Sequence, residues 1–352
     1  MIKKKLTING FGRIGRSVFR KAISDPRFDV VAINDLNPDT NNICYLYNYD
    51  SIHGVEAEAN RLRAINSNTI QIGKNGPLVT YSKSDSIEDI DLSNTDVIVD
   101  ASGLSNNGNS IKRALSNNPK IKVLATHMHP DAELYLVLGA NHDAQSTNNI
   151  SFVSSSICDA TALAPVIRAL DEKFGISKGH ITTVHPWLNY QNLMDGPSTS
   201  WANPGDIYHH YPLGRSALDN LIPKPTTAVD ATLQSLPGFD AQISSFSYRV
   251  PTSIVGSANL VLQLKEVPES KKEVIDAFIQ FDKNLPWPIF AINDDPLISK
   301  DFVNRPESAI IDSRWIELLD NQLHLVLWYD NENGYSARVL DQSEYITSEG
   351  LN

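Results

Sequence analysis

The chain has 352 residues, 41% of them apolar and 20% charged, a balance that is typical of globular proteins and argues against a disordered chain. Its length predicts about two domains, and no run approaches the roughly 20 apolar residues that a membrane span needs. Its 30 basic and 41 acidic residues give a net charge of −11, which argues against a positive surface for binding nucleic acid.

Short apolar runs alternate with helix-like stretches in the first third of the chain. This alternation predicts a parallel sheet with right-handed crossovers, which is a nucleotide-binding architecture. The predicted strands are Leu6–Ile8, Val30–Ile33, Val97–Val99 and Val123–Ala125, and the predicted helices are Ile14–Ile23 and Ile111–Leu115.

The pattern changes near Ser156, after which longer apolar runs predict a mixed or antiparallel sheet. One segment, Asp195–Pro225, is rich in Gly, Pro, Ser and Tyr and is too long for a plain connection, so we expect a functional loop there. The predicted strands of this part are Ile181–Val184, Ala241–Val250, Leu260–Leu264 and Leu323–Tyr329.

The segment Gly10–Gly15, with the sequence GFGRIG, lies directly after the first strand and opens the first helix. Such glycines permit a tight turn and let the backbone approach a pyrophosphate at the helix N-terminus. Asp35 ends the second strand about 20 residues further on, where a carboxylate would hydrogen-bond a ribose hydroxyl and repel a 2′-phosphate. The pattern therefore favours NAD over NADP, with a helix cap or turn as the alternative role of Asp35.

Cys158 follows three serines and precedes the helix-forming stretch that contains Ala162. A thiol at a helix N-terminus has its thiolate stabilised by the helix dipole, which makes it a candidate nucleophile. His185, at the end of the strand Ile181–Val184, is a candidate base for it. The alternatives are a buried structural cysteine and a core histidine.

The remaining cysteine and histidines show no ligand spacing. Cys44 and Cys158 cannot build a disulfide framework and lack the clustering of a zinc or iron–sulfur site, so we expect no metal and a reducing cytoplasm. We interpret the other neighbouring histidines, which have no carboxylate or cysteine partner at ligand spacing, as surface side chains: His127, His129, His209 and His210.

Seven blocks resemble, in order, those of the phosphorylating glyceraldehyde-3-phosphate dehydrogenases: Ile8–Arg16 (INGFGRIGR), Tyr49–Gly54 (YDSIHG), Val99–Gly103 (VDASG), Thr182–His185 (TTVH), Asp195–Ser198 (DGPS), Arg249–Thr252 (RVPT) and Trp328–Tyr335 (WYDNENGY). The resemblance spans residues 1 to about 345. It implies an α/β fold with a Rossmann NAD-binding domain over residues 1–157, a mixed-sheet catalytic domain over residues 158–331, and a C-terminal helix within 332–352 that returns to the first domain. It also implies a cytoplasmic homotetramer that acts on a small aldehyde in glucose metabolism.

Carried over by position, the resemblance implies that Cys158 is the nucleophile and His185 its base. The thiolate would attack an aldehyde, the hemithioacetal would give a hydride to NAD, and inorganic phosphate would cleave the resulting thioester. The backbone amides of Arg13 and Ile14 would hold the pyrophosphate, and Asn331 would hold the nicotinamide carboxamide. The cofactor residues implied in full are Asn9, Gly10, Gly12, Arg13, Ile14, Gly15, Asp35, Thr126 and Asn331.

The departures from the family's pattern cluster around the proposed active site. Ile157 and Asp159 replace the hydroxyls that flank the family's nucleophile, and the carboxylate of Asp159 would repel an anion about 4 Å away by about 1 to 4 kcal/mol. Leu188 and Tyr190 replace a threonine and an aspartate that help to hold the substrate's phosphate. The family's Thr-Gly turn reads Thr-Thr, and the lysine after it is Asp230. The substrate-binding residues that the resemblance leaves are Asp159, Thr226, Thr227, Arg215 and Arg249.

Three functions stay open at this point. The first is a phosphorylating aldehyde dehydrogenase with rebuilt anion sites. The second is a related enzyme for another aldehyde, or one in which water takes the acyl group, similar to the erythrose-4-phosphate dehydrogenases. The third is an NAD-binding paralogue without catalysis. The loop between Asp195 and Arg215 is longer than the family's by roughly nine residues, and we interpret the insertion, which contains Trp201, Tyr208, His209, His210 and Tyr211, as remodelling of the substrate pocket.

Overall fold

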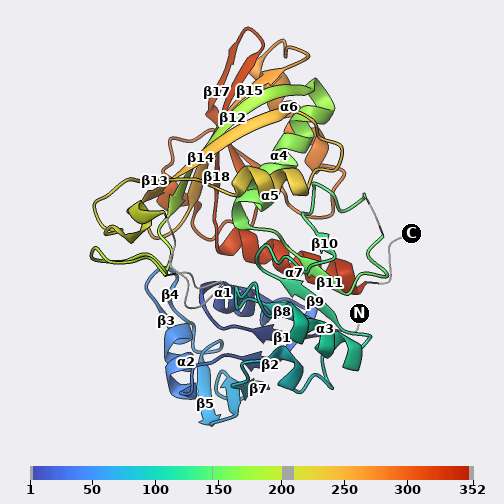
Figure 1. Ribbon diagram of the computed structural model, residues 1–352, viewed down its shortest axis with the longest axis vertical. Helices are drawn as coiled ribbons and strands as arrows, with labels where there is room; N and C mark the ends of the chain where they lie inside the picture. The colour runs from blue at the N-terminus through green and yellow to red at the C-terminus, as the bar shows by residue number, and fades with distance from the viewer. Residues whose placement is uncertain (1–2, 145, 200–209, 349–352) are drawn as a thin grey trace. The chain divides into compact units, whose positions relative to one another are not determined.

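A nine-stranded sheet forms the centre of the first of two units into which the chain divides (Figure 1). The structure, a computed structural model, describes residues 3–144, 146–199 and 210–348, and the first unit comprises residues 1–135, 146–155 and 339–352. Seven strands are parallel in the order β10-β11-β9-β8-β1-β2-β7, and β6 and β5 follow as antiparallel strands. The strands are β1 (Lys4–Asn9), β2 (Phe28–Asn34), β5 (Leu62–Asn66), β6 (Thr69–Ile72), β7 (Leu78–Ser82), β8 (Val97–Asp100), β9 (Lys122–Ala125), β10 (Leu134–Tyr135) and β11 (Phe152–Ser154).

The central strands of this sheet are buried along most of their length because parallel strands are covered on both faces. All four residues of β8 are buried, for example. The ring of Phe11 packs against Phe19 and Tyr47, with ring centroids 5.5 and 6.3 Å away, and this cluster fixes the turn that follows β1. The helices and the remaining hairpin are α1 (Arg13–Ala22), α2 (Thr40–Asn48), α3 (Gly108–Asn117), η1 (Ile87–Asp89), and the paired strands β3 (Tyr49–Asp50) and β4 (Gly54–Val55).

A seven-stranded mixed sheet forms the second unit, which comprises residues 136–145 and 156–338. Its order is β13-β14-β12-β15-β18-β17-β16, with β12 parallel to β14, β16 parallel to β17, and every other pair antiparallel. Its elements are α4 (Cys158–Phe174), β12 (Ile176–Pro186), η2 (Tyr211–Gly214), β13 (Ile222–Lys224), α5 (Ala228–Gln234), β14 (Gln242–Val250), β15 (Gly256–Leu264), α6 (Lys271–Asp282), β16 (Phe290–Asn293), η3 (Ser299–Phe302), β17 (Ala309–Leu319) and β18 (Gln322–Tyr329).

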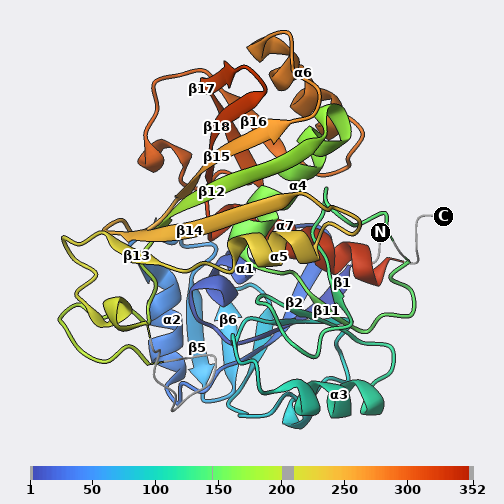
Figure 2. The same cartoon turned by 45° about the horizontal axis from the view of Figure 1, so that its top comes forward.

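Three helices pack beside this sheet. Helix α4 contacts both α5 and α6, which lie apart from each other in Figure 2. The buried positions of β15 and β18 alternate, and every second residue from Gly256 and from Leu323 is buried. The helices therefore cover a single apolar face, and polar residues at the end of that face can line a site.

The last helix, α7 (Asn333–Thr347), passes from the second unit into the first. Within the first unit, Arg27 forms ion pairs with Asp341 at 2.8 Å and with Glu344 at 2.6 Å, and the ammonium group of Lys4 donates to the carbonyl of Thr347. Among the residues that the structure describes, no helix has the length and apolar character needed to cross a membrane.

The structure confirms the predicted fold class, with a largely parallel sheet, a second mixed sheet and a C-terminal helix. It also shows elements that the sequence pattern did not predict. The segment Asp195–Pro225 contains β13, and within it the N–H of Gly196 donates to the carbonyl of Gly214 at 2.8 Å. Of the aromatic residues expected in the insertion, Trp201, Tyr208 and His209 lie outside the described residues.

The prediction that the neighbouring histidines lie at the surface is wrong for His129. Its side chain is buried, its Nε2 lies 2.8 Å from Oδ1 of Asn107, and its ring contacts Phe152 with a centroid distance of 4.8 Å. The residue follows β9 and packs on the apolar side of β11. The spacing of the two histidines could not show this packing.

Candidate active site and cofactor-binding residues

The glycine-rich turn after β1 contains two glycines at positions where no side chain would fit. Gly10 has a φ of +87°, and a Cβ there would lie 2.6 Å from the backbone nitrogen of Ser102. A Cβ on Gly15 would lie 2.0 Å from the carbonyl oxygen of Gly10. Gly12 differs, because a Cβ there would meet no atom within 4 Å. The turn is thus packed closely on the protein side and open beside Gly12.

Helix α1 begins at this turn without a side-chain cap. Gly12 is its N-cap, and no acidic residue lies in the first turn. The backbone N–H groups at such a helix start lack partners within the helix and can hold a phosphate. The guanidinium group of Arg13 forms an ion pair with Asp50, with 2.6 Å between Nη1 and Oδ2. Burial raises the pKa of Asp50, but hydrogen bonds from backbone N–H groups and Arg13 outweigh it and lower the value to about 2.

Asp35 lies immediately after β2 and faces the same turn. Its Oδ2 accepts from the N–H of Phe11 at 2.7 Å, and its Oδ1 accepts from the N–H of Asn37 at 2.9 Å. Asn9 joins the neighbouring strands, since it donates to Asp100 at 2.9 Å and accepts from Asn34 at 2.8 Å. The first unit therefore brings the predicted residues Asn9, Gly10, Gly12, Arg13, Ile14, Gly15 and Asp35 to the carboxyl ends of β1 and β2.

Two predicted cofactor residues lie elsewhere. Thr126 follows β9, and its N–H and hydroxyl both donate to the carbonyl of Asp100, at 2.9 and 3.2 Å. Asn331 belongs to the second unit, where its Oδ1 accepts from the N–H of Val255 at 3.0 Å. Val255 has a φ of +68°, which is rare for a β-branched residue, so this hydrogen bond holds a strained backbone in place. The Nδ2 group of Asn331 is left to donate to a ligand.

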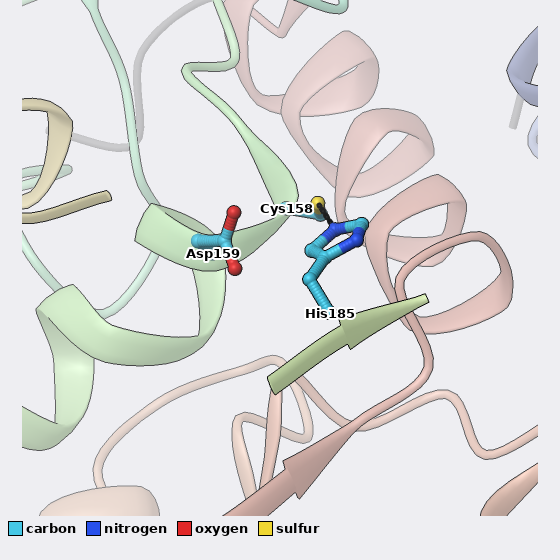
Figure 3. Close-up of side chains that lie close together, drawn as sticks. All are labelled: Cys158, Asp159 and His185. Carbon is cyan, nitrogen blue, oxygen red and sulfur yellow. Dashed lines mark hydrogen bonds between the residues drawn. The ribbon is translucent and has the colours of Figure 1, made fainter. Parts of the chain in front are cut away.

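Cys158 is the first residue of α4, and its thiol points toward the imidazole of His185 at the end of β12 (Figure 3). The distance from Sγ to Nε2 is 3.6 Å. The other ring nitrogen, Nδ1, lies 2.8 Å from the carbonyl oxygen of Pro186. A carbonyl can only accept, so Nδ1 carries the proton and Nε2 is the free base that faces the thiol.

Both members of this pair are neutral in the folded chain near pH 7. Burial, followed by the positive charge of Arg249, lowers the pKa of His185 to about 4, against the opposite effect of Asp159. Burial also raises the pKa of the Cys158 thiol well above its ordinary value, and the carboxylate of Asp159 adds to that effect. The sequence predicts a thiolate stabilised by the helix start, but burial opposes it. Ionisation of Cys158 therefore requires transfer of its proton to His185.

Asp159, the next residue of α4, is 9% exposed and accepts a hydrogen bond from the phenol of Tyr329. Figure 3 shows its carboxylate beside the imidazole of His185. Burial, the charge of Asp159 and this hydrogen bond raise the pKa of Tyr329 far above its ordinary value, so the phenol stays a donor. Asp159 thus has one oxygen fixed by a neutral donor.

The side chains of the second unit's site share one row across its sheet. Arg249 is paired with Ile222 of β13 on one side and with His185 of β12 on the other. The pairing of Val184 with Ser257 places His185 opposite the next residue of β15, Gly256, which is itself paired with Tyr329. Paired residues point to the same face of a sheet. Cys158 and Asp159 lie over this row at the start of α4.

Gly256 makes room for the phenol in that row. A Cβ at this position would lie 2.5 Å from Cζ of Tyr329 and 2.7 Å from its hydroxyl oxygen. The ring therefore crosses above the glycine on its way to Asp159. A side chain at position 256 would push the ring away.

Of the predicted anion ligands, Arg249 is the one in this row. It is 7% exposed, and its Nη2 donates to the hydroxyl of Tyr190 at 3.2 Å. Arg215 is exposed and pairs with Asp195 at 2.6 Å. Thr226 accepts from the N–H of Ala228, and Thr227 is the N-cap of α5.

Sequence reasoning missed Lys224, Gly256 and Tyr329. Lys224 and Gly256 lie outside the seven blocks and Tyr329 lies within the last one, and only the order and register of the strands bring them into or beside the row. Cys158, Asp159 and His185 each place an atom that could bind a metal within 4.8 Å of the others, and they are the one such group of three among the described residues. Sequence spacing could not show this arrangement. Within this group, the carboxylate of Asp159 accepts a hydrogen bond from Tyr329, and the thiol of Cys158 faces Nε2 of His185.

Comparison with known proteins links both units to a single family. The model described as the NAD binding domain of glyceraldehyde 3-phosphate dehydrogenase matches residues 4–108, and the model of its C-terminal domain matches residues 157–331. Glyceraldehyde-3-phosphate dehydrogenase 1 of Bacillus cereus is 33% identical over 351 residues, covering 99% of both chains. The enzyme of Geobacillus stearothermophilus is 33% identical over 352 residues, covering 99% of both chains, and the cytosolic enzyme of Ginkgo biloba is 33% identical over 350 residues, covering 98% of both.

Proposed function

We propose that this chain, which belongs to the glyceraldehyde-3-phosphate dehydrogenase family, oxidises an aldehyde that is bound covalently to Cys158 and uses NAD as its cofactor. Members of this family are NAD-dependent oxidoreductases that act on an aldehyde group. The observation that carries the proposal is the thiol of Cys158 facing an unprotonated nitrogen of His185 at 3.6 Å. The test is a screen of phosphorylated and unphosphorylated aldehydes for NADH formation. A chain that forms no NADH with any of them would be an NAD-binding paralogue without this activity.

The residues of the second unit would perform the proton transfers. Nε2 of His185 takes the proton of the thiol as sulfur attacks the aldehyde carbon, and it returns this proton to the carbonyl oxygen, which becomes the hydroxyl of the hemithioacetal. Nε2 is then neutral again and takes the hydroxyl proton as the hydride leaves. Bound NAD supplies the acceptor for the hydride that leaves that carbon. A thioester on Cys158 remains. Because His185 is neutral before the reaction, it can accept a proton at each step.

The residues present fit NAD. The open space beside Gly12 and the uncapped start of α1 would accept the pyrophosphate, and Asp35 would accept from the ribose hydroxyls. Nδ2 of Asn331 would donate to the carboxamide of the nicotinamide. We propose these roles, together with those of Asn9 and Thr126, from the resemblance and from these contacts.

The carboxylate of Asp35 is expected to make the enzyme prefer NAD to NADP. A 2′-phosphate would meet this charge and would replace a hydroxyl that the carboxylate can bind. Asp35→Ala should lower the ratio of kcat/KM with NAD to kcat/KM with NADP by about 10-fold or more, which is the scale of one hydrogen bond to a charged group. Asp35→Asn, which can keep an acceptor for Phe11 N–H, separates the charge from the support of the turn. A wild-type enzyme with the higher kcat/KM for NADP would refute the role of Asp35.

The transfer of the acyl group from Cys158 to an acceptor is the step at which this chain departs most from its family. Ile157 offers no hydroxyl, and Asp159 places a buried carboxylate beside the thiol. We propose that inorganic phosphate takes the acyl group but binds weakly. The second candidate is hydrolysis, which the position of Asp159 favours because a carboxylate can take a proton from an attacking water.

Turnover is therefore expected to depend weakly on inorganic phosphate, or to need it at concentrations far above the family norm. Asp159→Thr removes the negative charge and supplies a hydroxyl, so it should strengthen the dependence. The measurement is the initial rate of NADH formation against phosphate concentration at fixed ionic strength, so that screening does not imitate binding. Tight saturation by phosphate in the wild-type enzyme, unimproved by Asp159→Thr, would contradict this assignment.

We also propose a cytoplasmic location, a homotetramer and a part in glucose metabolism. The support is the resemblance over the whole chain and the cytosolic relative of Ginkgo biloba.

A further inference from the structure

A lysine that the family resemblance does not assign lies at the edge of the catalytic sheet. Lys224 ends β13, the edge strand, and stands between Pro223 and Pro225. A residue that precedes a proline is restricted to extended backbone, so Pro225 holds Lys224 extended. Pro223, which lacks an N–H, is tolerated because the strand lies at the edge. The two prolines therefore fix the direction of the Lys224 side chain before any ligand binds.

The register of β13 on β14 directs Lys224 toward the active site. Lys224 is paired with Ser247, and Ile222 two residues earlier is paired with Arg249. Residues two apart in a strand, and residues paired across strands, share a face, so Lys224 and Arg249 lie on the same face as diagonal neighbours, with about 7 to 8 Å between their Cα atoms. Arg249 is in turn paired with His185. The lysine therefore lies beside the end of the row of active-site side chains, on the same face of the sheet.

The two cations have fewer partners than their burial calls for. The Nε of Arg249 is buried and has no hydrogen-bond partner among the described residues, and its Nη2 is bound by the neutral hydroxyl of Tyr190. Within the same described part of the chain, Lys224 takes part in no ion pair, although it is half-buried. Among the groups whose charge acts on Lys224, Asp159 is the one carboxylate and Arg249 is the other cation, and Asp159 is bound to Tyr329. Two buried cations facing one carboxylate leave an excess of one positive charge.

We propose that Lys224 and Arg249 together form the binding site for a phosphoryl group, which enters either on the aldehyde or as inorganic phosphate. The inference rests on the proposed function and adds Lys224 to it as a residue that determines substrate specificity. A phosphoryl group would accept a hydrogen bond from the orphaned Nε of Arg249 and bring negative charge to the two cations. Because the carboxylate of Asp159 lies beside the thiol, we expect the phosphoryl group of the aldehyde to be the one bound.

The charge of Lys224 gives this site a pH dependence of its own. Burial and the charge of Arg249 together lower the pKa of Lys224 to about 8, against the opposite effect of Asp159. The lysine is charged below about pH 8 and loses its charge above it, so phosphoryl binding weakens as the pH rises from 7 to 9. His185, with a pKa of about 4, does not titrate in this range.

The experiment compares Lys224→Gln, which removes the charge, with Lys224→Arg, which keeps it. Lys178→Gln is the matched control, because Lys178 is an exposed residue of β12, seven positions before His185 and on the opposite face. Kinetics with NAD give KM and kcat for glyceraldehyde 3-phosphate, for unphosphorylated glyceraldehyde and for inorganic phosphate. Calorimetry of glycerol 3-phosphate, which has no aldehyde, measures phosphoryl binding without turnover.

We expect Lys224→Gln to raise the KM for the phosphorylated aldehyde about 10- to 100-fold, which is the scale of a charge-assisted hydrogen bond. The Kd of glycerol 3-phosphate should rise by the same factor. The kcat/KM for glyceraldehyde should stay within about 2-fold, and Lys224→Arg should restore most of the loss. The wild-type preference for the phosphorylated aldehyde should fall between pH 7 and 9, and Lys224→Arg should abolish that fall.

The arms of the experiment separate the two sources of the phosphoryl group. A rise in KM confined to inorganic phosphate would support the site and assign it to the free anion. An equal loss for both aldehydes, with unchanged binding of glycerol 3-phosphate, would overturn the inference. If the wild-type chain forms no NADH with any aldehyde, the proposed function fails, and calorimetry still decides whether Lys224 binds a phosphoryl group.

Discussion

Cys158→Ala is expected to abolish NADH formation with every aldehyde that the wild-type enzyme oxidises. Without the thiol there is no hemithioacetal and no covalent route to an acyl group, so the residual rate should lie below detection. The residue is the first of α4, and its Sγ faces Nε2 of His185 at 3.6 Å. The measurement is the initial rate at saturating NAD and aldehyde, together with the affinity for NAD, which should persist because the glycine turn and Asp35 are unchanged.

The other cysteine supplies the control for this variant. Cys44 is buried in the first unit on α2, and burial raises the pKa of its thiol to about 11. Cys44→Ala removes a thiol without touching the site, so it should keep the wild-type rate. Aldehyde-dependent reduction of NAD by Cys158→Ala would overturn the covalent mechanism.

His185→Asn is expected to lower kcat by about 10² to 10⁴, the usual scale for loss of a general base. The thiol of Cys158 has a pKa far above neutral, so without Nε2 its proton has no acceptor within the pair. His180→Asn is the matched control, because His180 precedes His185 by five positions on β12, lies on the other face and contacts Ser244 at 2.8 Å. The control should keep the wild-type rate, whereas an unchanged rate in His185→Asn would give that residue a structural role.

The same histidine fixes the acid side of the pH profile. Its pKa of about 4 means that it stays neutral from pH 7 down to about 5, and that kcat/KM falls only as the pH approaches 4. Its ordinary pKa is about 6.5, so the unfolded chain binds the proton more tightly. The part of the folding free energy that comes from this group is therefore lost as the pH falls from about 6.5 to 4.

The elements that carry the cofactor residues could be predicted because their pattern is local. The apolar runs of β1, β2, β8 and β9 have the length of strands, and the glycines after β1 need no distant partner to be interpreted. The antiparallel strands β5 and β6 could not be predicted, because exposed residues interrupt their apolar pattern.

The catalytic row could be predicted only in part. Cys158 and His185 lie at the start of a helix and the end of a strand, and both positions can be recognised in the sequence. Lys224 lies between two prolines in a segment that resembles a loop, and only the strand register shows that it is a diagonal neighbour of Arg249. The raised pKa of Cys158 was also beyond the sequence pattern, because it depends on the burial that the packed unit imposes.

The space above Gly256 has a consequence for how this site tolerates change. The phenol of Tyr329 occupies the volume that a side chain at position 256 would fill, so the two positions, 73 residues apart, act as one packing unit. A larger residue at 256 is compatible only with a smaller one at 329, and that exchange would leave Asp159 without its buried donor. The orientation of the Asp159 carboxylate beside the Cys158 thiol thus depends on the absence of a side chain at Gly256.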